Sequence, residues 1–570
     1  MKKTILTLLT VYSSFSIELF AQTPNFNWAH GFQSDYNNII STTDASGNFY
    51  VSTSIGDGWG STTLDPQASV STTYISGQWT QVLAKYDANG DFIWMNDYAH
   101  PNGIGSALPG VSINAISTNS NNEVIVTGSF IGTFDFDLGP GTTTLTSNGD
   151  YDAFVLKLNT NGELLWLRQI GGVTAENSMS LTIDNNNNII ISGTYSGTID
   201  LNPNAGIDNV TSQGGQDVFI VKLDDNGGMV YGKSIGSISN DAPVRIAHSS
   251  TNEIYVAGWY FNSNGDFNPD SGVASISYNG TSGNFIVKLN QTGDFVYAKA
   301  FGNYANSNVK DMKVDGNGNI NLAGNYSATL DLDPANDTIN FSPAGNQDIY
   351  ILQLSPSGTT NWIRTIGSAN SEEVYSLDIN SNNELLIGTS FIGTVDFNPG
   401  IGTFDLTSAT SIQDAAFLNL NSSGTFINAY HFNTGNAGIF INSIALDNSN
   451  NIYSAGIFYG IIDFDFGTGT QNLTSMSSNL YIAKWGNIAT GFQAISSKNN
   501  SMTIFPNPAT NYISIEKNKP ASVSIFNTIG QEIFSKQIQT KEIIDISPLE
   551  NGIYIVRDNE TGENVKFIKQ

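Results

Sequence analysis

The sequence predicts an all-β protein: a seven-bladed β-propeller of four-stranded blades followed by a small β-sandwich. Three observations predict this fold. One phrase recurs seven times at nearly constant spacing, each copy contains four strand-like segments, and no sustained helical period interrupts them. With 39% hydrophobic residues and no cysteine among 570 residues, the chain can bury a core without disulfide bonds.

Charge excludes one class of partner. The chain has 50 acidic and 22 basic residues and a formal net charge of −28. Such a charge repels phosphate backbones, so we expect no nucleic-acid binding.

Residues 1–21 are typical of a secretory signal peptide. Lys2 and Lys3 precede an apolar run over 5–11, and Ala21 precedes Gln22 at the expected cleavage point. The apolar run is much shorter than the roughly 20 residues that a membrane-spanning helix needs. We therefore expect a mature chain that begins at Gln22 and has no transmembrane span.

The repeated phrase is an Asn-rich turn, a β run and a glycine, as in residues 122–128 and 451–456. Its anchor positions, separated by 75, 65, 65, 66, 64 and 68 residues, are Thr53, Gly128, Gly193, Gly258, Gly324, Gly388 and Gly456. The third copy shows the four strand-like segments, at 180–184, 189–195, 217–223 and 229–233. A tight-turn sequence, Asp224-Asp225-Asn226-Gly227, joins the last two. Four antiparallel strands per copy indicate a propeller blade.

The two ends of the repeat array predict how the ring closes. Most copies place an aromatic residue after the turn between the third and fourth segments (Trp94, Trp166, Tyr231, Tyr297 and Trp362), whereas the sixth has Asn428. The seventh copy stops at Trp485 without a fourth strand, and residues 26–29 resemble a fourth strand with nothing before it. We expect the strand of Trp28 to complete the seventh blade, which would leave no exposed sheet edge.

These repeats resemble the seven-bladed β-propeller repeats of secreted bacterial proteins. The phrases that carry the resemblance lie at 132–137, 197–203 and 393–400, and the resemblance covers roughly residues 25–487. It implies the fold and little about function. We assign residues 22–490 to the propeller.

An Asp-apolar-Asp/Asn phrase recurs in most copies and offers oxygen ligands two residues apart. Calcium takes six to eight oxygens, so the candidate ligands are Asp135, Asp137, Asp331, Asp333, Asp463 and Asp465. Alternatively, these side chains hydrogen-bond within turns. Recurrence favours turns, because a structural joint must recur whereas a binding site need not. No other cofactor is expected.

The C-terminal region differs in charge from the propeller, since residues 498–570 contain eight basic and eight acidic residues. We assign residues 491–501 to a linker and 502–570 to a separate β-sandwich. Its motifs resemble those of the type A C-terminal sorting domain of the Bacteroidetes type IX secretion pathway: Phe505-Pro506-Asn507-Pro508, Gly530, Gly552 with Tyr554, and a basic end that includes Lys569. The resemblance implies that the type IX machinery exports the protein to the outer-membrane surface or the extracellular space.

No catalytic motif is recognisable. The four histidines fall at different places in the repeat, and neither a serine-hydrolase elbow nor a metalloprotease motif occurs. We expect a non-enzymatic binding or adhesion module for an extracellular protein or polysaccharide. The alternatives are a carboxylate-dependent polysaccharide hydrolase or lyase, and a calcium-stabilised structural surface protein. Trp59 and Trp79 are candidates for stacking on sugar rings, although packing explains them as well.

Overall fold

The computed structural model describes residues 23–32, 36–55, 61–62, 64–66, 72–73, 80–98, 110–261, 265–277, 282–334, 339–408, 413–432, 434, 437–486, 502–517, 519–527, 532–559 and 564–570. One compact unit spans 23–488, and the C-terminal residues from 489 onward belong to another. The expected signal peptide with Ala21 and Gln22, and the expected linker 491–501, lie outside the described residues. No helix occurs in the described part of the chain, so none there could cross a membrane.

In its described residues, the first unit contains seven antiparallel sheets of at least four strands, which we call blades 1 to 7. Blade 1 contains β2 (Tyr36–Thr43), β3 (Phe49–Ile55), β6 (Thr80–Tyr86) and β7 (Phe92–Asp97). Blade 2 contains β8 (Val111–Thr118), β9 (Val124–Phe130), β12 (Asp152–Leu158) and β13 (Leu164–Gly172). Blade 3 contains β14 (Asn177–Ile183), β15 (Ile189–Tyr195), β18 (Asp217–Leu223) and β19 (Met229–Ile235). Blade 4 contains β20 (Asp241–His248), β21 (Ile254–Tyr260), β22 (Gly283–Leu289) and β23 (Phe295–Phe301).

The remaining blades follow the same order. Blade 5 contains β24 (Ser307–Val314), β25 (Ile320–Tyr326), β28 (Asp348–Leu354) and β29 (Thr360–Ile366). Blade 6 contains β30 (Glu373–Ile379), β31 (Leu385–Phe391), β34 (Asp414–Leu420) and β35 (Phe426–His431). Blade 7 contains β36 (Gly438–Leu446), β37 (Ile452–Asp463), β38 (Asn472–Trp485) and the N-terminal β1 (Phe26–Phe32). Short outer strands follow several second strands: β4 (Ser61–Thr62), β5 (Thr72–Thr73), β10 (Thr133–Asp135), β11 (Thr144–Thr146), β16 (Thr198–Asp200), β17 (Asn209–Thr211), β26 (Leu330–Asp331), β27 (Asn340–Phe341), β32 (Thr394–Asp396) and β33 (Asp405–Thr407).

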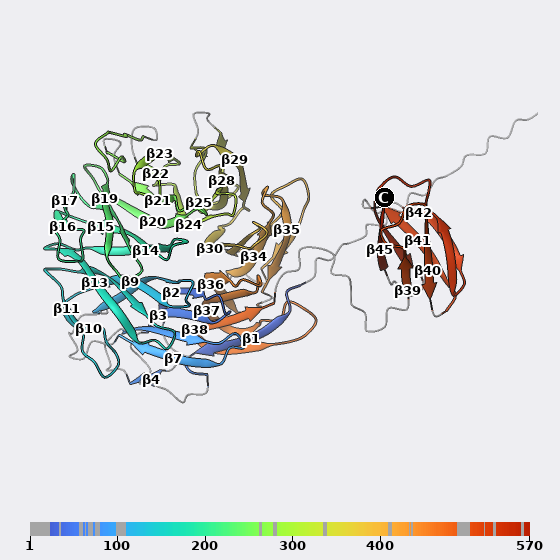
Figure 1. Cartoon of the computed structure of the whole chain (residues 1–570), viewed down its shortest axis with the longest axis horizontal. Coiled ribbons are helices and arrows are strands. Elements are labelled where there is room, and N and C mark those ends of the chain that lie inside the picture. Colours follow the sequence, from blue (N-terminus) through green and yellow to red (C-terminus); the bar gives the residue numbers. More distant parts are fainter. Residues whose placement is uncertain are drawn as a thin grey trace, which may run out of the picture. The chain divides into compact units, whose positions relative to one another are not determined.

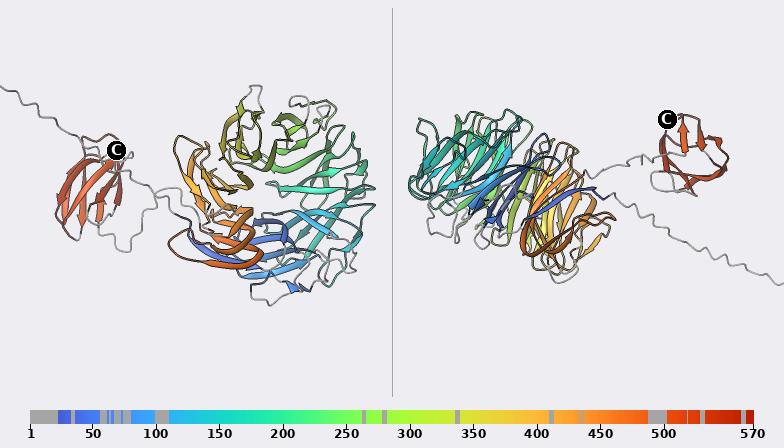
Figure 2. Two further views of the ribbon diagram at one scale, coloured as in Figure 1. Left: turned by 180° about the vertical axis from the view of Figure 1, so that it is seen from behind. Right: turned by 90° about the horizontal axis from the view of Figure 1, so that it is seen from below.

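The blades are arranged in a closed ring (Figures 1 and 2). The first strand of each blade contacts the first strands of its neighbours, and β36 of blade 7 contacts β2 of blade 1. The second and third strands are buried along almost their whole length, as β9 and β12 show, because other blades cover both faces of the sheet. The prediction of an all-β propeller is confirmed.

The N-terminal strand completes the seventh blade as predicted. Strand β1 pairs antiparallel with β38, so that Phe26 lies opposite Trp485 and Trp28 opposite Lys484. In Figure 1 the blue β1 therefore lies beside the orange β38. Trp28 shares one hydrophobic cluster with Phe49 of blade 1 and Tyr453 of blade 7.

The glycine of the repeated phrase lies opposite a β-bulge in the first strand. A Cβ atom there would lie 1.8–2.1 Å from a first-strand carbonyl oxygen at five anchors, Gly128, Gly193, Gly258, Gly324 and Gly456. The predicted sixth anchor, Gly388, is one residue too early. Val374 pairs with Thr389, as Ile113 pairs with Gly128, so Thr389 and not Gly388 occupies the equivalent position. Glycine spacing is therefore a close but imperfect guide to register.

The C-terminal unit is a small sandwich of two antiparallel sheets, as predicted. One sheet contains β39 (Met502–Phe505), β40 (Tyr512–Lys517) and β43 (Lys541–Asp545). The other contains β42 (Glu532–Ile538), β41 (Ala521–Asn527), β44 (Gly552–Asp558) and β45 (Asn564–Lys569). Both sheets contribute to one core, in which Ile513, Ile525 and Val556 are buried.

Candidate functional site

The antiparallel order gives the propeller two chemically different faces. Turns between the first and second strands and between the third and fourth strands, such as 184–188 and 224–228, lie on what we call the turn face. Loops between the second and third strands and the connections between blades, such as 196–216 and 236–240, lie on the opposite, loop face.

On the turn face, side chains hydrogen-bond to the backbone of their own turns. Asp184 Oδ1 accepts the N–H groups of Asn186 and Asn188, both at 2.9 Å. The same arrangement recurs in every blade, with the acceptors Asp44, Asn119, Asp184, Ser249, Asp315, Asn380 and Asp447. These residues stabilise turns because a side-chain oxygen replaces a missing backbone acceptor.

The recurrent aromatic residue packs on a glycine of the next blade. The glycines of the turns between third and fourth strands have positive φ, and a Cβ at Gly162 would lie 2.9 Å from the Trp94 ring. The equivalent pairs are Trp28 with Gly90, Trp166 with Gly227, Tyr231 with Gly293, Tyr297 with Gly358 and Trp362 with Gly424. Blade 7 takes its fourth strand from the N-terminus and has no such turn, which explains why blade 6 carries Asn428 instead of an aromatic residue.

Buried lysines connect adjacent blades beside these aromatic contacts. Lys222 forms an ion pair with Asp184 at 2.8 Å and donates to the carbonyl of Gln291 in the next blade at 3.3 Å. Lys85, Lys157, Lys288 and Lys484 donate to equivalent carbonyls, and all five are at most 6% exposed. Only 12 basic residues lie between positions 22 and 497, against 41 acidic ones. Because the contacts between blades use many of the cations, acidic groups predominate on the propeller surface.

Five of the six candidate calcium ligands hydrogen-bond within their own loops, whereas Asp333 hydrogen-bonds to the first residue of β29. Asp135 Oδ1 accepts the N–H groups of Asp137 at 3.1 Å and Thr143 at 2.8 Å, and Asp463 and Asp331 accept equivalent pairs. Asp137 and Asp465 accept the N–H groups of Gly139 and Gly467, and Asp333 accepts the hydroxyl of Thr360. The six lie in three different blades, and the described residues contain no group of three His, Cys, Asp or Glu side chains that could hold a metal. The structure thus gives five of these side chains a role within a turn, and it gives Asp333 a hydrogen bond to β29.

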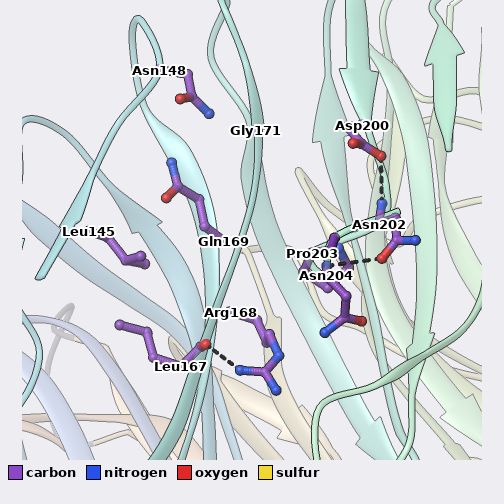
Figure 3. A pocket seen from close by; sticks show the side chains of 11 residues that line it. Leu145, Asn148, Leu167, Arg168, Gln169, Gly171, Asp200, Asn202, Pro203 and Asn204 are labelled. Atoms are coloured by element: carbon purple, nitrogen blue, oxygen red, sulfur yellow. Dashed lines mark hydrogen bonds between the residues drawn. The ribbon is translucent and has the colours of Figure 1, made fainter. Parts of the chain in front are cut away.

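A hollow of about 600 Å³ lies between blades 2 and 3, where β13 faces the loop after β16 (Figure 3). Its polar side chains mostly have partners within the protein. Arg168 donates to the carbonyls of Leu167, Asn226 and Gly227, and Asp200 accepts the N–H groups of Asn202 and Asp208. Few of its polar groups therefore remain for a ligand.

A cluster of aromatic side chains lies on the loop face. Unlike the side chains that hydrogen-bond within the turns and the hollow, these have no structural role that recurs in the other blades. Trp259, near the end of β21, stacks on Tyr304 with ring centroids 4.6 Å apart, and Phe261 packs edge-on against both. Phe261 is 39% exposed, and Trp259 and Tyr304 are partly exposed. The positions equivalent to Trp259 in the other blades hold Ser54, Ser129, Thr194, Asn325, Ser390 and Ile457.

The sequence interpretation missed this cluster. Its signal is a tryptophan at a position where the other copies have small or aliphatic residues. The two tryptophans it singled out instead, Trp59 and Trp79, lie outside the described residues.

Three pairs of buried acids also lie on the loop face: Asp152 with Glu176, Asp217 with Asp241, and Asp348 with Glu372. All six side chains are at most 3% exposed. Burial, together with the charges of Asp152 and Asp150, raises the pKa of Glu176 to about 7, and burial with the charge of Asp217 does the same for Asp241. A polymer on the surface could not reach these carboxyls.

The histidines play separate structural roles. His30 hydrogen-bonds to the carbonyl of Gly90, His248 to the hydroxyl of Thr182, and His431 to Asp414 at 3.0 Å. The three lie in different blades and do not meet, and His100 lies outside the described residues.

In the C-terminal unit three of the sorting-motif residues contact the last strand, which itself contains Lys569. Asn507 donates to the carbonyl of Lys566 and accepts the N–H of Ile568, both at 2.9 Å. Gly552 pairs with Lys569, and Tyr554 stacks on Phe567 with centroids 5.5 Å apart. Phe505 is 43% exposed, with Lys541 above its ring.

Three further motif residues are the two prolines and Gly530. Both proline peptide bonds of the motif, at Pro506 and Pro508, are cis. Gly530 lies outside the described residues.

Comparison with known proteins assigns the C-terminal unit. Residues 503–570 match the family described as the secretion system C-terminal sorting domain. A WD repeat-containing protein of Acanthamoeba polyphaga mimivirus, L264, is 25% identical over 273 residues, which are 42% of this chain and 19% of that protein. The chain thus spans about a fifth of that relative's length.

Among solved structures, the Dos1 propeller aligns over 81% of this chain and 95% of its own, with 7% identity and a TM-score of 0.40. The ulvan lyase of polysaccharide lyase family PL25 aligns over 75% of this chain and 93% of its own, with 10% identity and a TM-score of 0.41. Neither likeness bears on activity. With its sorting domain, the chain is a β-propeller protein that the type IX pathway secretes to the cell surface or the extracellular space.

Proposed function

We propose that the secreted propeller is a non-catalytic module that binds neutral polysaccharides through the aromatic cluster of Trp259, Phe261 and Tyr304. The observation that carries the proposal is a partly exposed aromatic stack on the loop face at a position where no other blade has an aromatic residue. A packing feature of the fold recurs from blade to blade, as the Trp94–Gly162 contact does. The cluster does not recur, so the fold does not require it.

The chemistry of the cluster suits sugar rings. Aromatic faces offer rigid apolar area to the C–H face of a pyranose, and nearby polar groups can bond its hydroxyls. Asn303 and Asn306 lie next to Tyr304 in the connection between blades 4 and 5. The acidic surface would repel sulfated or uronic acid polymers, which favours neutral ones.

The test compares Trp259→Ala with Ile207→Ala in the full mature chain. Ile207 is 80% exposed in a loop of blade 3, so its truncation controls for the loss of exposed apolar area on the same face. Retardation in gels that contain galactomannan, xylan or starch measures binding, with alginate as the anionic comparison. We expect Trp259→Ala to weaken binding to at least one neutral polymer by about tenfold or more, which corresponds to about 1.4 kcal/mol. Ile207→Ala should bind like the unmodified protein.

Equal retardation of both variants, or stronger retardation by alginate, would contradict the proposal. The same incubations are assayed for new reducing ends and unsaturated products. Their appearance would favour the hydrolase or lyase alternative, because a binding module leaves the polymer intact.

A further inference from the structure

The three buried acid pairs share one geometry. In each pair the first acid begins the third strand of a blade, and the second lies 24 residues later, at the start of the next blade's first strand. The N–H of Glu176 donates to the carbonyl of Tyr151 at 2.7 Å, and Asp241 and Glu372 make equivalent bonds at 2.7 and 2.9 Å. Each pair is thereby held together.

None of the six acids has a basic partner among the described residues. In addition, one oxygen of each first acid, Oδ1 of Asp152, Asp217 and Asp348, is buried without a hydrogen-bond partner. Two buried, unpaired carboxylates side by side are costly, so protons are needed to neutralise some of these groups.

In the first pair, the hydrogen bonds of the Thr174 hydroxyl indicate which acid is protonated. Thr174 Oγ1 lies 2.7 Å from Glu176 Oε1 and 2.6 Å from the carbonyl oxygen of Ser196. A carbonyl oxygen only accepts, and a threonine hydroxyl has a single proton. If the Thr174 hydroxyl donates its proton to the carbonyl oxygen of Ser196, it has no proton left for Glu176. The contact with Glu176 is then a hydrogen bond only when the Glu176 carboxyl is protonated and donates to Thr174 Oγ1.

The second pair repeats this arrangement. Ser237 Oγ lies 2.7 Å from the carbonyl oxygen of Phe261 and 3.1 Å from Asp241 Oδ1. Again one hydroxyl proton faces two acceptors, and the nearer acceptor is the carbonyl. Here that carbonyl belongs to a residue of the aromatic cluster.

The third pair differs in one side chain. Ser368 Oγ lies 2.6 Å from Glu372 Oε1, while the equivalent carbonyl, that of Ile392, accepts from the Asn370 amide at 3.0 Å. The Ser368 proton is therefore available to Glu372, and an ionised carboxylate fits the site. This pair is a natural control for the other two.

We propose that Glu176 and Asp241 are protonated in the folded protein, and that losing these protons as the pH rises loosens the loop face, including the Phe261 segment. Once ionised, each carboxylate competes with a backbone carbonyl for one hydroxyl proton and faces a second acid. If the aromatic cluster binds glycans as proposed above, binding weakens as the pH rises.

The electrostatics agree with this assignment for Glu176 and Asp241. The titratable groups that face the pairs are themselves acids. Asp150 and Asp152 face Glu176, Asp217 faces Asp241, and Asp348 faces Glu372. The phenols of Tyr195 and Tyr326 lie near Asp217 and Asp348. Burial raises the pKa of Asp217 to about 6 and also raises the pKa values of Asp152, Asp348 and Glu372. Because the folded pKa exceeds the unfolded one, the native state binds more protons above about pH 4.5. The stabilisation is complete below that pH and is lost as the pH rises through 7.

The test measures melting temperature from pH 5 to pH 8 for the full mature chain and the variants E176Q, D241N and E372Q. Gln or Asn stays neutral at every pH, and its amide N–H can donate to Thr174 or Ser237. We expect E176Q and D241N to melt at or below the unmodified protein at pH 5 and above it at pH 8. That crossover corresponds to a change of at least about tenfold in the unfolding equilibrium constant. E372Q should melt at or below the unmodified protein throughout.

A melting difference that does not change with pH for E176Q and D241N would overturn the proposal. An equal gain for E372Q at pH 8 would overturn the argument from hydroxyl protons. If D241N does not fold, E176Q decides.

A second measurement concerns the aromatic cluster. Gel retardation by the neutral polymer at pH 6 and pH 8 should weaken with pH for the unmodified protein and stay constant for D241N. Constant retardation of both would overturn the coupling to binding. A complete absence of retardation would contradict the proposed glycan function, while the melting curves still decide the proton assignment.

Discussion

The two faces of the propeller differ in how strictly their parts repeat. On the turn face, every blade has an Asp, Asn or Ser that accepts the N–H groups two and four residues later, and six turns carry a glycine under an aromatic ring. On the loop face, neighbouring blades differ: one has an aromatic stack, three junctions have buried acid pairs, and others have neither. Features that recur hold the blades together, and features that occur once are where function is to be sought.

The faces also differ in how charge is compensated. The buried lysines between blades have acidic or carbonyl partners, as Lys222 has Asp184 and Gln291. The buried acids of the loop face have no basic partner in the described residues, so protons must neutralise some of them. The turn face should therefore be insensitive to mild changes in pH, whereas the loop face should respond.

Removing the closing strand β1 should cause the largest loss of stability. Deleting residues 23–32 exposes the edge of β38, removes the buried Trp28 and Phe32, and breaks the Trp28 bond to the carbonyl of Ala88. Each buried aromatic side chain contributes about 3–5 kcal/mol, so we expect a loss above about 5 kcal/mol or failure to fold. Thermal unfolding of the mature chain measures it, with Trp28→Ala as the intermediate case. An unchanged melting temperature would mean that the ring is closed in another way.

The sequence predicts the features that repeat. The spacing of the phrase, four strands per copy and a final copy without its fourth strand were enough for the propeller and for the pairing of Trp28's strand with β38. Local chemistry was also enough to favour turns at Asp135 and its counterparts, because Asp and Asn bond the backbone two residues later. The register of the sixth copy could not be predicted in this way. The bulge that determines the position of the glycine is formed by the first strand of the blade, whereas the repeated phrase lies in the second strand.

Contacts across blades were beyond sequence reasoning. Lys222 and the carbonyl of Gln291 are 69 residues apart in the sequence. Trp259 and Tyr304 are in contact only because the connection between blades 4 and 5 passes beside the end of β21. The acid pairs did leave a signal, a constant separation of 24 residues at 152/176, 217/241 and 348/372. Its meaning depends on burial, which spacing alone does not reveal.

Two glycines with nearly the same backbone angle sharpen the comparison of the faces. Gly162 on the turn face has φ 83° and lies under Trp94, whereas Gly132 on the loop face has φ 81° and no atom within 4 Å of an added Cβ. Gly132→Ala should cost only the backbone strain, about 1–2 kcal/mol. Gly162→Ala adds a clash with the ring and should cost about 2–5 kcal/mol in all. Equal losses in chemical denaturation would show that the aromatic contact contributes nothing to holding the blades together.

The smallest expected effect concerns the hydrogen bonds between adjacent turns. Asn383 has φ 61°, and its side chain accepts the N–H of Gly316 in the preceding blade at 2.9 Å. Five such bonds follow the ring, and the two positions without one, at Gly47 and Gly318, are those where glycine replaces asparagine.

Asn383→Gly keeps the backbone angle and removes only the bond. Because the bond is exposed to water, we expect a loss of at most about 1 kcal/mol in denaturant unfolding. Asn383→Ala removes the same bond and adds left-handed strain, so it should cost about 1–2 kcal/mol more. If Asn383→Gly were as damaging as Gly162→Ala, the polar contacts between turns, and not the aromatic–glycine packing, would hold the blades together. The ring would then be expected to tolerate few further glycines at these positions, yet Gly47 and Gly318 already occupy two of the seven.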